Sequence, residues 1–120
     1  MWYSPGDIVS VRVGTGAVRH EGIMTEHGRV ISNSRKQGGV FEESVRSFSG
    51  GRKIKNHGQL RPADPMQVLA RARSQIGRAY HPYTHNCEHF VRFCYGKSPY
   101  SPQKMGAMSL VALAAAIAAL

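Results

Sequence analysis

The segment Asn86-Cys87-Glu88-His89-Phe90-Val91 contains a cysteine whose thiol could attack a carbonyl carbon. Asn86 is a favourable N-cap residue, because its side-chain oxygen can accept a backbone N–H two or three residues further on, which would place Cys87 in the first turn of a helix. The unpaired N–H groups and the dipole at a helix N-terminus stabilise an anion, so we expect the pKa of the Cys87 thiol to lie below its usual value of about 8.5. The segment therefore predicts a reactive thiolate.

The same spacing also has a purely structural explanation. Four residues, Cys87, Phe90, Val91 and Cys94, follow the i, i+3, i+4, i+7 pattern of one apolar helical face, and cysteine is among the most buried residue types. On spacing alone this explanation is slightly favoured. Two cysteines seven residues apart on one helix lie roughly 10 Å apart, beyond the ~7 Å that a disulfide can bridge between Cα atoms, so both should stay reduced within the chain.

A cysteine nucleophile needs a group that takes its proton, and the chain has six histidines. His20 lies in a predicted strand beside Gly22, whose missing side chain lets another element approach closely. On pattern, His20 is the best candidate for the base. The other five are expected in loops, at the surface, or on another side of the cysteine helix: His27, His57, His81, His85 and His89.

The composition bounds the class of protein. A chain of 120 residues forms one domain with a modest core, and 42% hydrophobic against 19% charged residues is typical of a globular fold. Residues 1–20 contain Asp7 and no apolar stretch of the kind found in a secretory signal, so the reducing cytoplasm is the expected compartment.

The strong positive charge points to a polyanionic partner. Sixteen Lys and Arg residues against seven Asp and Glu give a net charge of +9, which attracts nucleic acid or the headgroups of anionic lipids. The basic residues are dispersed from Arg12 to Lys104, which is typical of a solvated surface. A nucleic-acid-binding module should interleave aromatic and basic residues on one face, and Tyr80, Tyr83, Arg92 and Phe93 give only a weak version of that pattern.

Most of the predicted strands come in the first half of the chain. Val9, Val11 and Val13 alternate with polar residues as in a half-buried strand. Residues 17–24 and 29–33 read as two strands of a hairpin, joined by a short loop that ends in Gly28. We expect a short strand at residues 40–41, a turn of helix within 42–48 and a basic loop over 52–58.

Two helices should cover this sheet. Asp64-Pro65 predicts a helix start and Gly77 its end, with Val68, Leu69, Ala72 and Ile76 on the buried face. The second helix should begin at Asn86 and end near Tyr95. The sequence thus predicts an α+β fold in which a small antiparallel β-sheet packs against two helices.

The last part of the chain differs from the rest. We expect a catalytic domain over residues 1–97, a linker over 98–104 and an apolar tail over 105–120, helical because it is rich in alanine. Its 16 residues fall short of the roughly 20 needed to span a bilayer. The tail could pack on the domain or in an oligomer, or it could dip into an anionic membrane surface and make the protein peripheral to a membrane.

Three stretches together resemble a known family: Arg19-His20-Glu21-Gly22-Ile23, Gly28-Arg29-Val30-Ile31 and the segment 86–91. They resemble the LRAT-like proteins, which are the relatives of lecithin:retinol acyltransferase and the small phospholipase/acyltransferases. That family is a circularly permuted branch of the NlpC-type, papain-like thiol hydrolases, in which the histidine strand precedes the cysteine helix. The order of His20 and Cys87 is similar, and the resemblance covers about residues 5–97.

The resemblance implies roles for four side chains. Cys87 would be the nucleophile and His20 its general base. The family usually carries a second histidine twelve residues after the first, and Ser32 stands there, so the base would be oriented less firmly and activity could be slower. Tyr80 resembles a tyrosine that precedes the cysteine in the wider superfamily, where a phenol could help to stabilise an oxyanion.

These roles describe an enzyme that forms an acyl-enzyme on Cys87 and passes the acyl group to water or another acceptor, without a cofactor. A phospholipid or another acyl ester is the leading substrate. The nearest alternative is a cysteine peptidase or amidase of the same superfamily, and a nucleic-acid-binding module without catalysis is the second. A zinc site is disfavoured, because the spacing of its candidate ligands matches no usual motif: His81, His85, Cys87 and His89.

Overall fold

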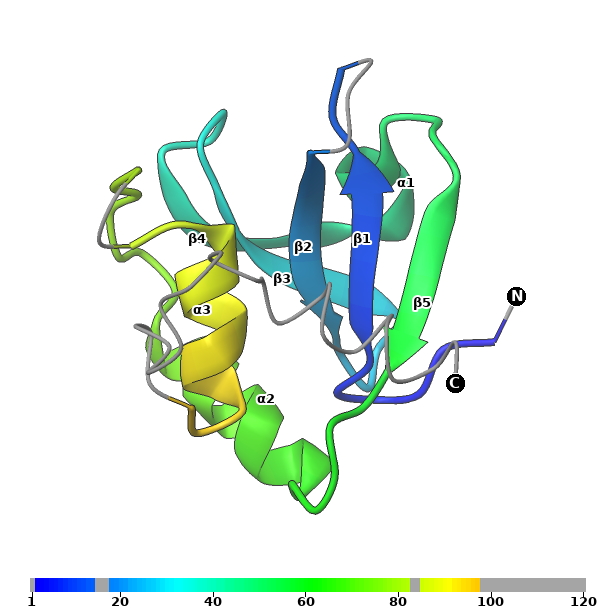
Figure 1. The fold of residues 1–120 in the computed structure, drawn as a ribbon, viewed down its shortest axis with the longest axis vertical. Coiled ribbons are helices and arrows are strands. Elements are labelled where there is room, and N and C mark those ends of the chain that lie inside the picture. The colour runs from blue at the N-terminus through cyan, green and yellow to red at the C-terminus, as the bar shows by residue number, and fades with distance from the viewer. Residues whose placement is uncertain (1, 15–17, 83–84, 98–120) are drawn as a thin grey trace.

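A computed structural model describes residues 2–14, 18–82 and 85–97, and every structural statement below concerns those residues. Five strands form one antiparallel sheet in the order β4-β3-β2-β1-β5 (Figure 1). Their bounds are β1 Ile8–Arg12, β2 Arg19–Met24, β3 Arg29–Ser34, β4 Gly39–Ser44 and β5 Ile54–Gly58. The helices of the described chain are α1 Val45–Ser49, α2 Pro65–Ser74 and α3 Cys87–Cys94. The predicted α+β fold is confirmed.

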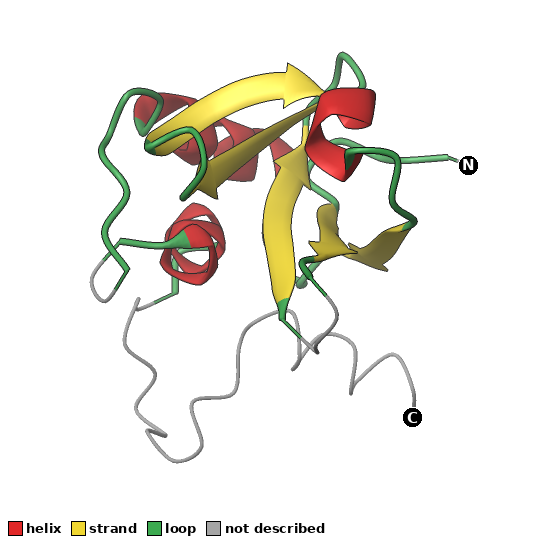
Figure 2. Cartoon of the chain, turned by 90° about the horizontal axis from the view of Figure 1, so that it is seen from above, coloured by secondary structure: helices red, strands yellow, loops and turns green. Residues whose placement is uncertain are grey.

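The sheet carries an apolar layer on each face. Successive strand residues point to opposite faces. One set, including Ile8, Ile23 and Ile31, is buried against α2 and α3. The other set, including Val9 and Met24, is buried on the side of α1, with Phe48. Figure 2 shows α3 and α1 on either side of the central strands.

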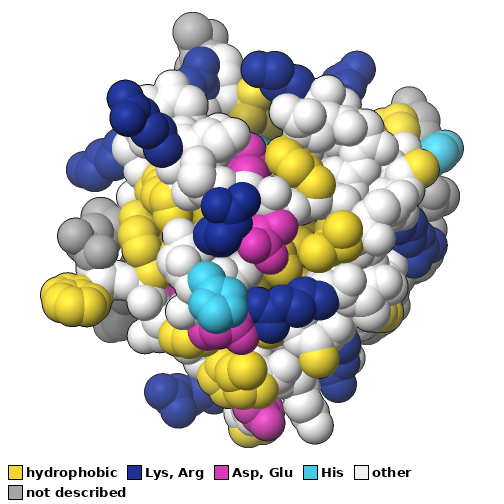
Figure 3. Space-filling view, turned by 180° about the vertical axis from the view of Figure 1, so that it is seen from behind, with side chains coloured by type: hydrophobic (Ala, Val, Ile, Leu, Met, Phe, Trp, Pro, Cys, Tyr) yellow, Lys and Arg dark blue, Asp and Glu magenta, His cyan; other side chains and the backbone are white. Residues whose placement is uncertain are grey.

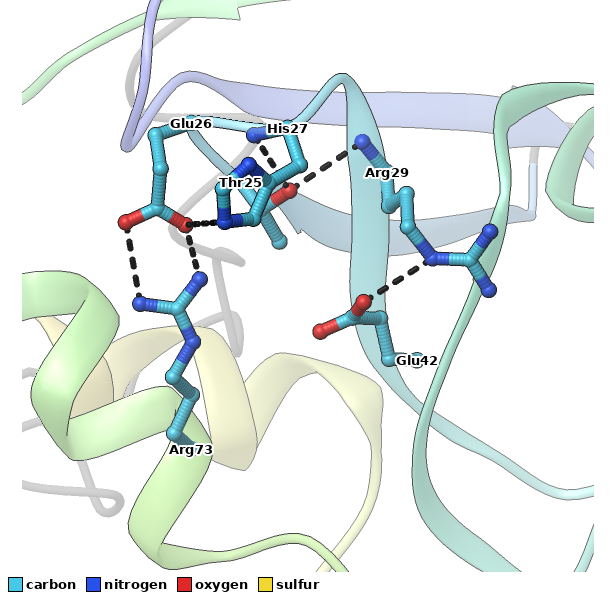
Figure 4. Close-up of polar contacts among 6 residues, drawn as sticks. All are labelled: Thr25, Glu26, His27, Arg29, Glu42 and Arg73. Atoms are coloured by element: carbon cyan, nitrogen blue, oxygen red, sulfur yellow. Dashed lines mark hydrogen bonds and ion pairs between the residues drawn. The ribbon is translucent and has the colours of Figure 1, made fainter.

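The predicted hairpin of β2 and β3 is confirmed, and its turn is tied to the rest of the fold (Figure 4). The Thr25 hydroxyl accepts the backbone N–H groups of His27 and Arg29, each at 3.1 Å. The guanidinium of Arg73 on α2 donates to both carboxylate oxygens of Glu26. This ion pair links the hairpin turn to α2, which lies much later in the chain.

The prediction for residues 52–58 is wrong, because this stretch contains the edge strand β5 rather than a basic loop. An edge strand pairs on one side only, and among the five residues of β5 only Ile54 is buried, so the alternating apolar signal is missing. The strand at 40–41 is also longer than expected, since β4 extends to Ser44 and α1 begins only at Val45.

The two predicted helices are confirmed with small changes at their ends. Asp64 caps α2 by accepting the N–H of Met66 at 3.0 Å, and Pro65 is its first residue. The helix ends at Ser74, so Ile76 lies beyond it and is 48% exposed, against the expectation that it joins the core.

The predicted linker and the tail at 105–120 lie outside the described residues. Among the helices that are described, none is long and apolar enough to cross a membrane.

Candidate active site

Cys87 is the first residue of α3 and directly follows the predicted N-cap residue, Asn86. The Asn86 side-chain oxygen accepts the N–H of His89 at 3.0 Å, and the His89 ring nitrogen Nδ1 accepts the N–H of Asn86 at 3.4 Å. This reciprocal pair is a capping box, with histidine in the place usually taken by Glu or Gln. The structure therefore confirms the N-cap prediction and gives His89 a role in closing the helix start.

Asn33 on β3 ties the segment before Cys87 to the sheet. Its buried side-chain amide donates to the carbonyl oxygens of His85 at 2.9 Å and Asn86 at 3.4 Å. The sequence placed Asn33 at the end of a predicted strand and gave it no role at the site. The available signal was alternation, because Asn33 lies two residues after Ile31 and therefore points to the face that α3 covers.

The start of α3 lies where the sheet divides. β2 and β3 pair only at Ile23 with Ile31 and at Met24 with Val30, whereas β3 continues beside β4 as far as Ser34. α3 contacts both diverging strands. The backbone N–H groups of Glu21, on β2, and of Glu88, on α3, interact with the Cys87 sulfur. The thiol is half-buried at this division of the sheet.

The expectation of a lowered thiol pKa is wrong for this structure. Burial raises the pKa of Cys87 to about 11, and the nearby Glu21 carboxyl adds to the rise. The N–H groups of Glu21 and Glu88 oppose it, as a helix N-terminus should, but they are outweighed. Removing the thiolate from water costs more than these N–H groups return.

Glu21 is the ionisable side chain that the structure brings to Cys87 and that sequence reasoning missed. It is 4% exposed, and its Oε2 atom has no hydrogen-bond partner within the described chain. Burial, with Glu88 as a second cause, raises the pKa of this carboxyl to about 8, while Arg92 acts in the opposite direction. A charged residue inside a strand was the signal that could have found it, because Glu is almost never fully buried without a partner.

His20 and Ser32 lie on strands β2 and β3, on the side of the sheet that α1 covers. The His20 ring stacks on Phe48, with the ring centroids 5.1 Å apart, and burial lowers its pKa. Ser32 is fully buried and alternation places it on the same face as Val30. Within the described residues no hydrogen bond joins His20 to Cys87 or to Ser32, so both catalytic roles stay predictions.

Gly22 explains how His20 comes to lie against Phe48. A Cβ atom at Gly22 would stand 2.5 Å from Cγ1 of Val30 and 3.1 Å from the Phe48 ring. The close approach predicted from this glycine therefore occurs, but the helix that packs against Gly22 is α1 and not the start of α3.

Tyr80 is held near the thiol by an extension of the sheet. The segment 77–80 runs along β4, where the N–H of Val40 donates to the Arg78 carbonyl at 3.0 Å and the N–H of Tyr80 donates to the Gly38 carbonyl at 2.9 Å. Burial raises the pKa of Tyr80, and Cys87 is the second cause. The phenol thus lies in the surroundings of Cys87, and its role at an oxyanion stays a prediction.

A second polar cluster lies on the same face as Glu21. Ser10 is the cross-strand partner of Glu21, and its hydroxyl lies 2.8 Å from Nε2 of His57. Arg19 donates to the same hydroxyl at 2.6 Å, so the Ser10 oxygen accepts one hydrogen bond and is also within hydrogen-bond distance of the imidazole. Burial and two neighbouring cations lower the pKa of His57 to about 4. His57 reaches this face because it is the extra residue of a bulge in β5.

The candidate zinc ligands do not gather around a common point. Among the described residues, no group of three or more His, Cys, Asp and Glu side chains could hold a metal ion.

Fold and site together define an α+β domain that presents a cysteine at the start of a helix packed on an antiparallel sheet. The family model described as lecithin retinol acyltransferase matches residues 3–99. The chain therefore belongs to the lecithin retinol acyltransferase family, which is consistent with the superfamily of thiol acyltransferases and hydrolases. No curated protein matches the chain.

Proposed function

We propose that this protein transfers or hydrolyses acyl groups through a thioester on Cys87. The observation that carries the proposal is the placement of Cys87 as the first residue of a capped helix, with its sulfur at the division between β2 and β3. The sulfur attacks the acyl carbon and expels the leaving group. Water or another nucleophile then releases the acyl group and frees the thiol.

The helix start also supplies groups for the oxyanion. The first N–H groups of a helix have no intrahelical partner and can donate to the negatively charged oxygen of the tetrahedral intermediate. Tyr80 adds a phenol in the surroundings of the same sulfur. Such donors are worth most in a site shielded from water, and the burial of Cys87 supports that condition.

For the general base of Cys87, the order of residues in the family and the local contacts of His20 point in different directions. Family order favours His20, and burial holds its pKa below 6.5, so that the ring is neutral and able to accept a proton at pH 7. Its ring nevertheless rests on Phe48 rather than on Cys87. His20→Ala should slow acylation about 100-fold or more if His20 is the base and only slightly if it packs against α1.

A phospholipid or another acyl ester is the proposed substrate. The net charge of +9 supports an anionic lipid surface as the place where the protein meets it. On the face shown in Figure 3, however, Lys and Arg side chains are interspersed with acidic and apolar ones rather than gathered. A peptide amide is the alternative substrate.

The test is intact-mass analysis of the full chain after incubation with dihexanoyl phosphatidylcholine and, separately, with a hexanoyl-peptide amide. We expect a hexanoyl adduct from the phospholipid that Cys87→Ala abolishes. Cys94→Ala is the matched control, because Cys94 is buried in the core and its loss should leave the adduct in place. An adduct from the amide alone would favour the peptidase, and lipid turnover that survives in Cys87→Ala would refute the thiol mechanism.

A further inference from the structure

One end of the sheet gathers positive charge that no ion pair neutralises. It lies where β1 ends and where β2 and β5 begin (Figure 1). Cross-strand pairing and the segment that leads into β5 bring five cationic side chains there. Within the described chain, every ion pair involves other side chains. We call this cluster the basic end, and its residues are Arg12, Arg19, Arg52, Lys53 and Lys55.

Two guanidinium groups of the basic end are held by neutral acceptors. Arg19 donates from Nε to the Ser10 hydroxyl at 2.6 Å and from Nη2 to the Ser10 carbonyl at 3.2 Å. Arg52 donates to the carbonyl oxygens of Arg12 and Gly14. A guanidinium has five N–H donors, so each group is oriented by the sheet and still has donors for a further acceptor. Phosphate oxygens match the planar fork of these donors.

His57 lies in the positive field of the basic end. Its Nε2 atom is 2.8 Å from the Ser10 hydroxyl oxygen, the same oxygen that accepts the hydrogen bond from Arg19. Burial, with Lys55 and Arg19 as further causes, lowers the pKa of His57 to about 4. Cations that repel one another in this way are stabilised when an anion binds beside them.

Two exposed valines lie next to the basic end. The N–H of Val13 donates to the Val18 carbonyl at 2.9 Å, which continues the pairing of β1 and β2 past Arg12. Val13 is 49% exposed and Val18 is 68% exposed. Valine cannot stack on a nucleic-acid base as an aromatic ring does. Apolar side chains beside Lys and Arg are instead typical of a surface that lies in the headgroup region of a membrane.

The orientation of α3 relates the basic end to the candidate nucleophile. Tyr95, at the C-terminal end of α3, donates its hydroxyl to the carbonyl of Gly6 at 2.5 Å. Gly6 precedes β1, whereas the basic end lies where β1 finishes. α3 therefore begins, at Cys87, on the side nearer the basic end and runs away from it (Figure 1).

We propose that the basic end is a docking surface for an anionic phospholipid membrane, with its cations at the headgroup phosphates and Val13 and Val18 in the interfacial layer. The inference deepens the proposed acyl transfer, on which it rests for the lipid class of the substrate. Docking in this orientation brings the start of α3, with Cys87, toward the lipid.

The experiment measures binding of the full chain to vesicles of phosphatidylcholine with about one third phosphatidylglycerol, by sedimentation. The double substitution Lys53→Gln and Lys55→Gln should weaken binding about 25-fold, or about fivefold for each cation removed from an anionic surface. Both side chains are exposed, and no hydrogen bond of the described chain depends on them. Val13→Ser with Val18→Ser should weaken binding several-fold, because the interfacial layer favours apolar side chains.

The matched control is the double substitution Arg61→Gln and Lys97→Gln, which removes the same charge. Both residues are exposed, and they follow Gln59 and Tyr95, whose side chains bond to residues just before β1. They therefore lie toward the opposite end of the sheet, farther from the docked surface than a Debye length of about 8 Å. Vesicle binding should change by about twofold or less. Residues 105–120 are the same in both variants, so any contribution from them cancels.

Turnover separates docking from catalysis. Lys53→Gln with Lys55→Gln should slow turnover of phospholipid in the vesicles but leave turnover of soluble dihexanoyl phosphatidylcholine unchanged. Equal vesicle binding by the two double variants, or no vesicle binding by the unaltered protein, refutes the docking surface. If glycerol 3-phosphate or a uridine oligonucleotide binds through these lysines and vesicles do not, the surface serves a soluble anion and the proposal is overturned. Failure of the proposed function shows separately, as the absence of an acyl adduct on Cys87.

Discussion

At the scale of single residues, Cys87 shows that a helix N-terminus does not by itself make a thiolate. The N–H groups around its sulfur favour the anion, yet burial and the Glu21 carboxyl raise the pKa to about 11. A resting thiol of this kind needs a base within reach at the moment of attack. The ionisation of Cys87 is therefore the property that its neighbours control.

This ionisation predicts how Cys87 reacts with iodoacetamide. Because only the thiolate reacts, and the pKa lies near 11, the alkylation rate should rise close to tenfold per pH unit between pH 7 and pH 10. An ordinary exposed cysteine would level off near pH 9. Peptide mass spectrometry can follow Cys87 separately from Cys94, which is fully buried and should react more slowly. A plateau for Cys87 below pH 9 would contradict the raised pKa.

At the scale of elements, the start of α3 is held from two directions. Asn86 and His89 close the first turn from within the helix. Asn33 holds the preceding carbonyls from the sheet. The helix cap and the side-chain amide of Asn33 on β3 together set the position of the Cys87 sulfur.

We expect Asn86→Ala to destabilise the fold by about 1 kcal/mol, because the N–H of His89 loses its acceptor. The first turn of α3 should also fray, which relieves the burial of Cys87 and speeds its alkylation several-fold. Asp64→Ala removes the corresponding cap of α2 and should cost a similar amount of stability without changing the alkylation rate. Urea denaturation and iodoacetamide labelling measure the two effects, and equal labelling of both variants would argue against the cap as a determinant of thiol access.

At the scale of the whole molecule, the face beneath α3 buries titratable groups beside an apolar core. Glu21 and His57 both lie on this face of the sheet. Burial raises the pKa of Glu21 and lowers that of His57, so it favours the neutral form of both side chains. The folded chain therefore holds a proton on Glu21 that the unfolded chain has released above about pH 4.5. Such a difference couples the stability of the entire domain to pH.

The sign of the Glu21 effect follows from its raised pKa. Between about pH 4.5 and pH 8 the folded state binds more protons at this site than the unfolded state, so stability falls as pH rises. The shift can change the free energy of unfolding by up to about 5 kcal/mol, on the order of 1.4 kcal/mol for each pH unit of the shift. Glu21→Gln should match the unaltered protein near pH 4.5 and exceed it in stability at pH 9. Urea denaturation at both pH values tests this, and parallel pH curves for the two proteins would rule it out.

The amino-acid sequence by itself determined the elements with strong local signals. The capped starts at Asp64 and Asn86 and the turn at Gly28 depend on neighbouring residues, which is why they were predicted. β5 was missed because an edge strand needs little apolar alternation, and its partner β1 lies more than forty residues earlier along the chain.

Only the tertiary structure decided which side chains meet Cys87. His20 and Glu21 are adjacent on β2, and consecutive strand residues point to opposite faces, so one rests on Phe48 and the other lies beside the sulfur. Local pattern could place both residues on a strand, but the face that α3 covers depends on packing between segments far apart in the chain. The sequence therefore singled out Cys87 as the candidate nucleophile, while the fold showed that the Glu21 carboxyl is among the groups that alter its ionisation.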